Sequence, residues 1–304
     1  MVTQDEECSD EELVICDRFR LVHKITKGTF GTVILGMDLF NDNEVAIKME
    51  TKSNKRRHRL LFEYDIYRNL KAEVGFPEAF WYGSQGDFNI LVMELLGPSL
   101  EDLFNFCGGR FTLKTVLLLA DQLLARLQAL HEFGVIHRDI KPDNFAMGLG
   151  SKHNILIDMG LCKKIWSASE HKDHNPCLKK RAFCGTLRFA SPNAHQGVEL
   201  CRRDDLISLA YALLYFMKGD LPWFKCRAET IAKSSELIFA VKNEISVEEL
   251  CTDCPEEFMT FIKYCNELEF SQVPDYKEMR RLFWTLFLKK QFAFDNVFDW
   301  DLYK

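Results

Sequence analysis

Apolar and polar residues alternate in the N-terminal part of the chain, which is the pattern of strands that bury one face. The alternation is clear around residues 19–25 and again at residues 45–48, which read VAIK. Between them, residues 26–33 read TKGTFGTV, and the apolar segments on either side predict two strands joined by a glycine-rich turn. At residues 60–70 the spacing changes to one that favours a helix. The pattern therefore predicts a small strand-rich lobe.

This pattern breaks at Gly97-Pro98, and Ser99 followed by Asp102 three residues later predicts the start of a helix. Residues 112–131 carry apolar residues at helical spacing and predict one long helix. A short apolar strand is expected at residues 155–157. The remaining chain is predicted to be mostly helical, with segments at residues 204–217, 230–242, 255–268 and 275–287.

These elements predict an α+β fold with three regions. Residues 1–15 form an acidic leader that we expect to be disordered, residues 16–97 the strand-rich lobe and residues 98–304 a larger helical lobe. Because no internal repeat or low-complexity linker separates the two lobes, we expect one unit of about 18–304.

Composition narrows the classes of protein that fit this fold. No apolar run approaches the ~18 residues of a membrane span, and the N-terminus lacks the profile of a secretory signal. We therefore expect an intracellular protein without a transmembrane segment, located in the cytoplasm, with the nucleus left open. Separately, we expect the protein to be a monomer. The 11 cysteines follow no framework and are expected to be free thiols, and the single C-x-x-C at Cys251 and Cys254 lacks partners at zinc spacing. The formal net charge of −6 argues against a general nucleic-acid binder.

The strongest chemical signal is HRDIKPDN at residues 137–144. Its spacing suits phosphoryl transfer: Asp139 would orient the attacking hydroxyl, Lys141 would lie beside the transferred phosphate, and Asn144 would hold a magnesium ion. An ordinary solvated loop has a similar composition. The motif therefore carries weight only if the other parts of the same machinery follow in order.

Those parts are present. Lys48 ends the VAIK strand and would pair with the phosphates of a nucleotide, while Glu63 on the predicted helix would hold Lys48 in place. Asp158 follows the strand expected at residues 155–157, within Asp158-Met159-Gly160, and would be the second magnesium ligand.

The glycine-rich turn completes the set, because a residue without a side chain lets backbone N–H groups approach phosphates closely. It departs from G-x-G-x-x-G, since threonine stands where the first glycine belongs. The residues expected to lie over the phosphates are Thr26, Lys27, Gly28, Thr29, Phe30, Gly31, Thr32 and Val33.

Several segments resemble the casein kinase 1 family of serine/threonine protein kinases. LVMELLGPSLEDLFNFC at residues 91–107 resembles the hinge and following helix of that family, and HRDIKPDNFAMG at residues 137–148 resembles its catalytic loop. RRDDLISLAYALLYF at residues 202–216 is similar to its central helix, and GTLRFASPNAH at residues 185–195 to its activation segment. The resemblance covers about residues 18–304 and implies a bilobal protein kinase fold with ATP and Mg²⁺ as cosubstrates. It also implies transfer to serine or threonine of acidic or previously phosphorylated proteins.

The resemblance also assigns nucleotide-binding positions. Met93 matches the gatekeeper, and residues from Glu94 to Leu96 match the hinge whose backbone would bind adenine. Ala46 would lie against the adenine ring, with Ile25 and Val33 on its other side.

Basic residues matched through the resemblance predict the substrate preference. Arg188 matches the arginine expected to bind a phosphate or acidic group on the substrate, and Arg181 matches a basic position of the activation segment. Lys233 stands one place from the third basic position, which is Ser234 by simple counting. Recognition of phosphorylated substrates is therefore expected to be weakened or rebuilt at that point.

Two other functions fit parts of the sequence. A nucleotide-binding pseudokinase scaffold is suggested by Thr26 in place of glycine and Met159 in place of phenylalanine, and magnesium-dependent transfer to protein would exclude it. A metabolic small-molecule kinase is disfavoured by the GTLRFAS and RRDD segments. Because neither Thr26 nor Met159 removes a charge that the chemistry needs, we expect an active kinase.

Overall fold

The computed structural model describes residues 13–28, 31–52, 59–150, 154–166 and 176–302. Residues 1–12 of the predicted leader, and Thr29 and Phe30 of the glycine-rich turn, lie outside the described residues. The chain divides into two compact units, one comprising Met1–Arg68 and Pro77–Leu96, the other Asn69–Phe76 and Gly97–Lys304. None of the described helices is long and apolar enough to cross a membrane.

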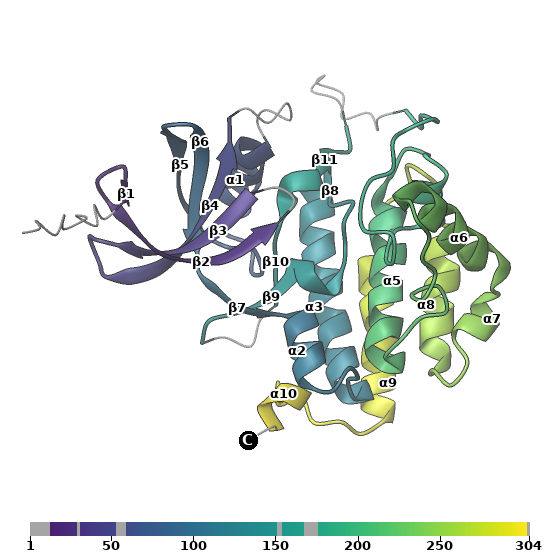
Figure 1. Ribbon diagram of the computed structural model, residues 1–304. Coiled ribbons are helices and arrows are strands. Elements are labelled where there is room, and N and C mark those ends of the chain that lie inside the picture. The colour runs from purple at the N-terminus through teal and green to yellow at the C-terminus, as the bar shows by residue number, and fades with distance from the viewer. Residues whose placement is uncertain (1–12, 29–30, 53–58, 151–153, 167–175, 303–304) are drawn as a thin grey trace, which may run out of the picture. The chain divides into compact units, whose positions relative to one another are not determined.

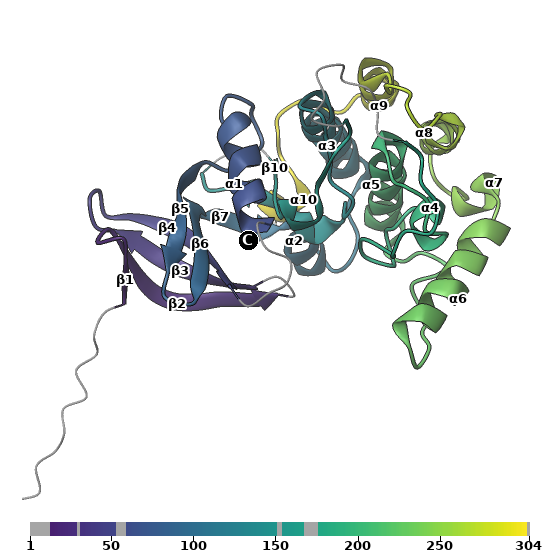
Figure 2. The ribbon, with the colours of Figure 1, turned by 90° about the horizontal axis from the view of Figure 1, so that it is seen from above.

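The first unit is built on a six-stranded antiparallel sheet with strand order β1-β2-β3-β4-β6-β5 (Figure 1). Its first strand uses Val14 and Ile15, at the end of the predicted leader. The strands are β1 (Val14–Ile15), β2 (Phe19–Gly28), β3 (Gly31–Asp38), β4 (Asn43–Thr51), β5 (Ala79–Gln85) and β6 (Phe88–Glu94). One helix, α1 (Arg59–Asn69), lies along one face of this sheet (Figure 2).

The alternation that predicted β4 separates its two faces. Val45 and Ile47 belong to a buried apolar cluster with residues of β1, β2 and β6. Ala46 and Lys48 point to the opposite face, where the Lys48 ammonium meets Glu63 of α1. The VAIK pattern thus builds a core on one face and presents a lysine on the other.

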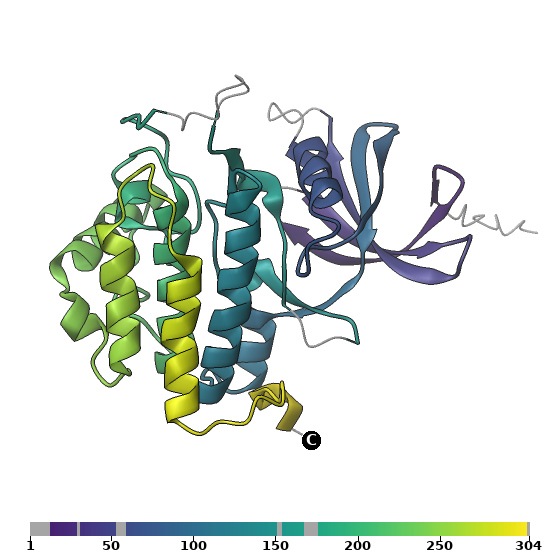
Figure 3. The same cartoon turned by 180° about the vertical axis from the view of Figure 1, so that it is seen from behind.

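The second unit is mostly helical, and its long central helix α3 packs against α5 and α9 (Figures 1 and 3). Leucines that are less than 5% exposed fill the buried side of α3. The helices are α2 (Leu100–Phe106), α3 (Leu113–Glu132), α4 (Pro192–His195), α5 (Arg202–Lys218), α6 (Ile231–Glu244), α7 (Val247–Leu250), α8 (Glu256–Glu267), α9 (Tyr276–Lys289) and α10 (Asp299–Leu302).

The helix starts follow the capping signals in the sequence. The Ser99 side chain accepts from the Asp102 N–H and the Asp102 carboxylate accepts from the Ser99 N–H, which makes a complete capping box at α2. Thr112, Thr230 and Asp275 accept from backbone N–H groups at the starts of α3, α6 and α9. The predicted boundaries of these helices lie within a few residues of the observed ones.

Short strands and 3₁₀ turns lie between the helices of the second unit. A three-stranded sheet has the order β10-β9-β7, and a two-stranded sheet pairs β11 with β8. The strands are β7 (Leu96–Ser99), β8 (Val135–Ile136), β9 (Phe145–Gly148), β10 (Asn154–Leu156) and β11 (Lys163–Lys164), and the 3₁₀ turns are η1 (Pro142–Asn144) and η2 (Met159–Leu161).

Candidate active site

The predicted catalytic loop lies between two antiparallel strand pairs of the second unit. The loop leaves β8, passes through η1 and enters β9, while β10 and β11 bring the segment around Asp158 alongside it. The Ile157 N–H donates to the Asn144 carbonyl at 2.9 Å, and the His137 ring lies 3.1 Å from the Ile157 carbonyl. Asn144 and Asp158, which the sequence predicted as metal ligands, are thus held on neighbouring segments.

Asp205 on α5 binds the backbone at the start of this loop. Its carboxylate accepts from the backbone N–H of His137 at 2.7 Å and of Arg138 at 2.8 Å, and the His131 ring donates to it at 2.8 Å. Burial alone would raise the pKa of Asp205, but the hydrogen bond and charge of His131 and the contacts with His137 hold it below its ordinary value. Sequence reasoning gave Asp205 no role beyond its place in the RRDD match.

Asp139 is 7% exposed, and three side chains surround its carboxylate. The Thr186 hydroxyl donates to Oδ1 at 2.7 Å, and the Asn144 amide donates to the Asp139 carbonyl at 2.8 Å and to Oδ2 at 3.3 Å. Nζ of Lys141 lies 3.4 Å from Oδ2 of Asp139 and 3.3 Å from the Thr186 hydroxyl. A buried carboxylate held by two donors and a cation can orient a hydroxyl group and take its proton. The structure therefore brings Asp139, Lys141 and Asn144 together.

Thr186 is the site residue that sequence reasoning missed. It follows Gly185, whose φ of +105° is a conformation that side chains rarely adopt, and a Cβ there would lie 2.7 Å from the Arg138 carbonyl. This close approach brings the Thr186 hydroxyl to the catalytic loop. The sequence signal that could have indicated Thr186 is its position in the GTLRFAS segment, at residues 185–191.

Magnesium fits the side chains of Asn144 and Asp158. The Asn144 amide nitrogen is used as a donor to Asp139, which leaves its Oδ1 as an oxygen ligand, and Asp158 supplies carboxylate oxygens. Magnesium prefers such oxygens and commonly takes one or two protein ligands in addition to phosphates. Asp158 adopts a left-handed backbone conformation with φ of 61°, and Met159 beside it is fully buried. Met159 therefore fills an apolar position, as expected of a residue in place of phenylalanine.

In the first unit, Lys48 and Glu63 form the predicted ion pair. Nζ of Lys48 lies 3.0 and 2.8 Å from the two carboxylate oxygens of Glu63, and the Tyr67 hydroxyl donates to Oε1 of Glu63 at 3.1 Å. The Glu63 side chain is 2% exposed and that of Lys48 is 14% exposed. Because neither charge is well solvated, the pair holds the lysine in one orientation.

The glycine-rich strands also form as predicted, with Gly28 at the end of β2 opposite Gly31 at the start of β3. Gly31 has a φ of +151°, and a Cβ there would lie 2.2 Å from the Met49 carbonyl, so only glycine fits. Thr26 of β2 pairs with Val33 of β3, next to a register irregularity, and Thr26 is not among the described residues with positive φ. The conformation at Thr26 therefore does not require glycine. Lys27 and Thr32 are also register partners.

The expected adenine-binding residues lie on neighbouring strands. Ala46 of β4 and Met93 of β6 are direct register partners, and each is 8% exposed. Glu94 ends β6 and Leu96 begins β7. Ile25 of β2 is 49% exposed.

Arg181 lines a cavity of about 290 Å³ in the second unit together with Arg138, Lys180 and Glu199. Glu199 is 4% exposed, and its two oxygens lie 2.6 Å from Nζ of Lys163 and 2.8 Å from Nε of Arg181. One buried carboxylate therefore faces several cations. The excess positive charge suits a bound anion.

Arg188 is exposed, and its guanidinium stacks over the Phe224 ring with 5.1 Å between Cζ and the ring centroid. Its backbone carbonyl accepts from the Trp223 indole at 2.7 Å. The guanidinium is thus oriented on an aromatic surface.

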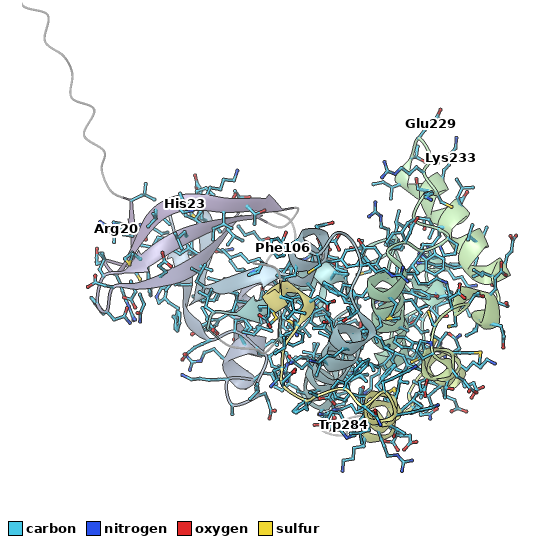
Figure 4. The ribbon with its side chains drawn as sticks, turned by 90° about the horizontal axis from the view of Figure 1, so that it is seen from below. Arg20, His23, Phe106, Glu229, Lys233 and Trp284 are labelled. Atoms are coloured by element: carbon cyan, nitrogen blue, oxygen red, sulfur yellow. The ribbon has the colours of Figure 1, made fainter. Side chains whose placement is uncertain are left out.

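Lys233 lies in the first turn of α6 with its side chain 64% exposed. Its ammonium is 3.8 Å from Glu229, and Figure 4 shows the two side chains together at that end of the helix. An exposed i,i+4 pair of this kind contributes little to stability. The Lys233 ammonium is therefore held only loosely by this pair.

Comparison with protein families matches residues 19–284 to the protein kinase domain. The match covers most of the 304 residues, and the chain belongs to the protein kinase family. The predicted α+β kinase fold, with a strand-rich region followed by a helical one, is confirmed. The reaction of this family is phosphoryl transfer from ATP to protein.

Proposed function

We propose that this protein kinase is of the casein kinase 1 type and phosphorylates serine or threonine in acidic or already phosphorylated proteins. The observation that carries the proposed transfer to a hydroxyl group is the environment of Asp139, whose carboxylate is held by Thr186, Asn144 and Lys141. Resemblance of the catalytic loop and of GTLRFASPNAH to the casein kinase 1 family supports the choice of serine or threonine.

The proposed reaction is direct in-line transfer. The oxygen of the substrate hydroxyl would attack the γ-phosphorus of ATP while the bond from that phosphorus to the β–γ bridging oxygen breaks, and ADP would leave. The hydroxyl proton would pass to the Asp139 carboxylate, and Lys141 would stabilise charge on the transferred group. Lys48, fixed by Glu63, would hold the phosphates of ATP.

Asn144 and Asp158 would hold magnesium, which when bound neutralises charge on the phosphate oxygens. Gly28 and Gly31 would let the backbone of the glycine-rich turn approach those oxygens. Ala46 and Met93 would contact adenine, and the backbone of Glu94 to Leu96 would supply its hydrogen bonds.

The proposed substrate preference rests on charge. Arg188, stacked on Phe224, and the cavity lined by Arg138, Lys180 and Arg181 would each favour an acidic or phosphorylated group. Arginine suits this role because its planar guanidinium can bind phosphate through two parallel hydrogen bonds.

The primary test compares wild type with Asp139→Ala on an acidic serine peptide. The variant is expected to lose at least ~100-fold in kcat, because it lacks the group that orients the hydroxyl and takes its proton. Equal phosphorylation by the two proteins would remove the assignment of Asp139. The same assay run with serine, threonine and tyrosine versions of one peptide tests the acceptor.

The substrate preference is tested with matched peptides that carry serine, aspartate or phosphoserine three residues before the target. A higher kcat/KM for the two charged peptides is expected. Equal values for all three peptides would reject the preference while leaving kinase activity itself untouched.

A scaffold without transfer is the alternative function, and ATP binding without phosphorylation of any protein would favour it. Its motivation came from Thr26 and Met159. Since Thr26 lies in a paired strand and Met159 is fully buried, neither residue provides a reason to expect loss of activity.

A further inference from the structure

Lys242 of α6 is a buried lysine that no part of the proposed mechanism uses. It is 6% exposed, and its ammonium lies over the rings of Tyr211 and Trp223 at 5.0 and 5.1 Å from their centroids. Among the described residues, no carboxylate lies within ion-pair distance of it. Burying a lysine ammonium without an acidic partner costs folding free energy. The aromatic rings and the hydrogen bonds of the ammonium must offset that cost.

Those hydrogen bonds go to the candidate substrate segment. Nζ of Lys242 donates to the Leu187 carbonyl at 2.9 Å and to the Ala190 carbonyl at 2.7 Å. The Trp223 indole, which lies beside the same ammonium, donates to the Arg188 carbonyl at 2.7 Å. Three carbonyls within four residues are thus held by donors from outside the segment.

The segment from Leu187 to Ala190 lies next to Thr186, which contacts Asp139, and it contains Arg188. Leu187 follows Thr186, whose hydroxyl contacts Asp139, and it precedes Arg188, whose guanidinium lies on Phe224. The Phe189 and Ala190 N–H groups both donate to the Thr186 carbonyl, so residues 186–190 form one turn. A shift of the Leu187 and Ala190 carbonyls would therefore move Thr186 and Arg188 together.

His195 is a further polar neighbour, with its Nε2 3.4 Å from Nζ of Lys242 and its Nδ1 2.7 Å from the Ser235 hydroxyl. Burial is the main cause, and the charge of Lys242 the second cause, that lowers the pKa of His195 to about 4. Burial also holds the pKa of Lys242 well below its ordinary value. Both a neutral amine and an ammonium have enough N–H groups for the two carbonyls.

We propose that Lys242 is a positioning residue for phosphorylation of protein substrates, which fixes the turn at residues 186–190 so that Thr186 orients Asp139 and Arg188 meets the acidic group of the substrate. The substrate class rests on the proposed function above. Lys242 itself touches neither substrate nor ATP in this proposal. Its effect should therefore fall on the peptide and spare the nucleotide.

The test uses Lys242→Met, which keeps most of the apolar stem and removes both hydrogen bonds. We expect kcat/KM for an acidic peptide to fall about 10-fold or more, because small displacements of positioning groups are costly. KM for ATP should change less than about twofold. The matched control is Lys263→Met, since the Lys263 ammonium pairs with the exposed Glu248 on the surface, and it should match wild type.

A second variant, Lys242→Ala, leaves space for a small amine. Added ethylamine should restore part of its peptide phosphorylation and have no effect on wild type, because the amine can remake the hydrogen bonds to the Leu187 and Ala190 carbonyls. If Lys242→Met retains kcat/KM for the peptide within about twofold, the proposal is wrong. A parallel loss of ATP binding and peptide phosphorylation would also overturn it, since that result indicates general damage.

Calorimetric binding of a phosphoserine peptide separates this inference from the proposed function. Peptide binding that is weakened about 10-fold by Lys242→Met supports the positioning role even if wild type transfers no phosphate, in which case only the proposed activity fails. Equal binding by wild type and variant, or no binding by either, would contradict the positioning role.

Discussion

The Thr186 hydroxyl donates a hydrogen bond to Oδ1 of Asp139 at 2.7 Å, across 47 residues of sequence. Lys141 lies beside the same hydroxyl at 3.3 Å. Thr186 therefore links the activation segment to the catalytic loop, and it fixes the orientation of a carboxylate that would otherwise rotate.

Thr186→Val keeps the shape of the side chain and removes its hydroxyl. We expect kcat for peptide phosphorylation to fall about 10- to 100-fold, because Asp139 loses the donor that orients it, with KM for ATP nearly unchanged. Thr186→Ser retains the hydroxyl and should keep kcat within about threefold of wild type. Steady-state kinetics on an acidic peptide make the comparison, and a valine variant as active as the serine variant would refute the role of the hydroxyl.

Glu63→Gln should weaken both ATP binding and the stability of the first unit. The substitution removes the Glu63 charge that faces the Lys48 ammonium, which is 14% exposed, and breaking such a pair costs about 3 kcal/mol. KM for ATP is expected to rise about 10-fold and the unfolding temperature to fall. Tyr67→Phe is the matched control, since it removes one hydrogen bond to Glu63 and keeps the ion pair, and its cost should be about 1 kcal/mol. Thermal unfolding with and without ATP would show an equal effect of the two variants if the charge of Glu63 did not matter.

Local signals in the sequence predicted local structure well. The capping box of Ser99 and Asp102 involves residues three positions apart, so its hydrogen bonds are determined by the segment itself. The VAIK pattern likewise separated the core face of β4 from the face of Lys48. Helices of four residues, such as α4 and α7, were not predicted because they are too short to display an amphipathic period.

Contacts between distant segments could not be predicted in the same way. Asp205 binds the His137 backbone across 68 residues, and Lys242 binds Ala190 across 52. Nothing in the residues around Asp205 or Lys242 indicates which backbone groups they will meet, since folding of the second unit decides it. Lys48 and Glu63, only 15 residues apart, were paired correctly because the strand and helix motifs each had a known partner.

Arg188 and Lys233 should differ in their effect on phosphorylated substrates. Arg188→Gln is expected to raise KM for a phosphoserine peptide about 10-fold, since a charge-assisted hydrogen bond is lost, and to change KM for the unphosphorylated peptide far less. Lys233→Gln should change both values less than about twofold, because its side chain is 64% exposed and paired with Glu229. Kinetics on the two peptides test both variants. A larger effect of Lys233→Gln than of Arg188→Gln would reverse the ranking of these residues.

Asp38 provides a test of stability against pH in the first unit. Its carboxylate, on a side chain 3% exposed, accepts from Nε of Arg18 at 2.8 Å and from a terminal nitrogen of the same guanidinium at 2.6 Å. The Arg18 hydrogen bond lowers the pKa of Asp38 below its ordinary value of 3.8, even though burial opposes the shift. A carboxyl whose folded pKa is lowered stabilises the folded state at pH values above its ordinary pKa, and that contribution is lost as pH falls through the folded pKa. The Asp38 carboxylate should therefore stabilise the unit fully at pH 7 and pH 5, and progressively less below about pH 4.

Asp38→Asn is expected to lower the unfolding temperature by roughly 3 °C or more at pH 7 and pH 5, because Arg18 loses its charged partner. The gap between variant and wild type should shrink at pH 3 and further at pH 2, as protonation of Asp38 makes the wild type resemble the variant. Circular dichroism across this pH series measures the gap, and Glu44→Gln, at an exposed acid of β4, serves as the control. A gap that stays constant down to pH 2 would show that the Asp38 charge contributes nothing to folding, because only a charge-dependent contribution disappears on protonation.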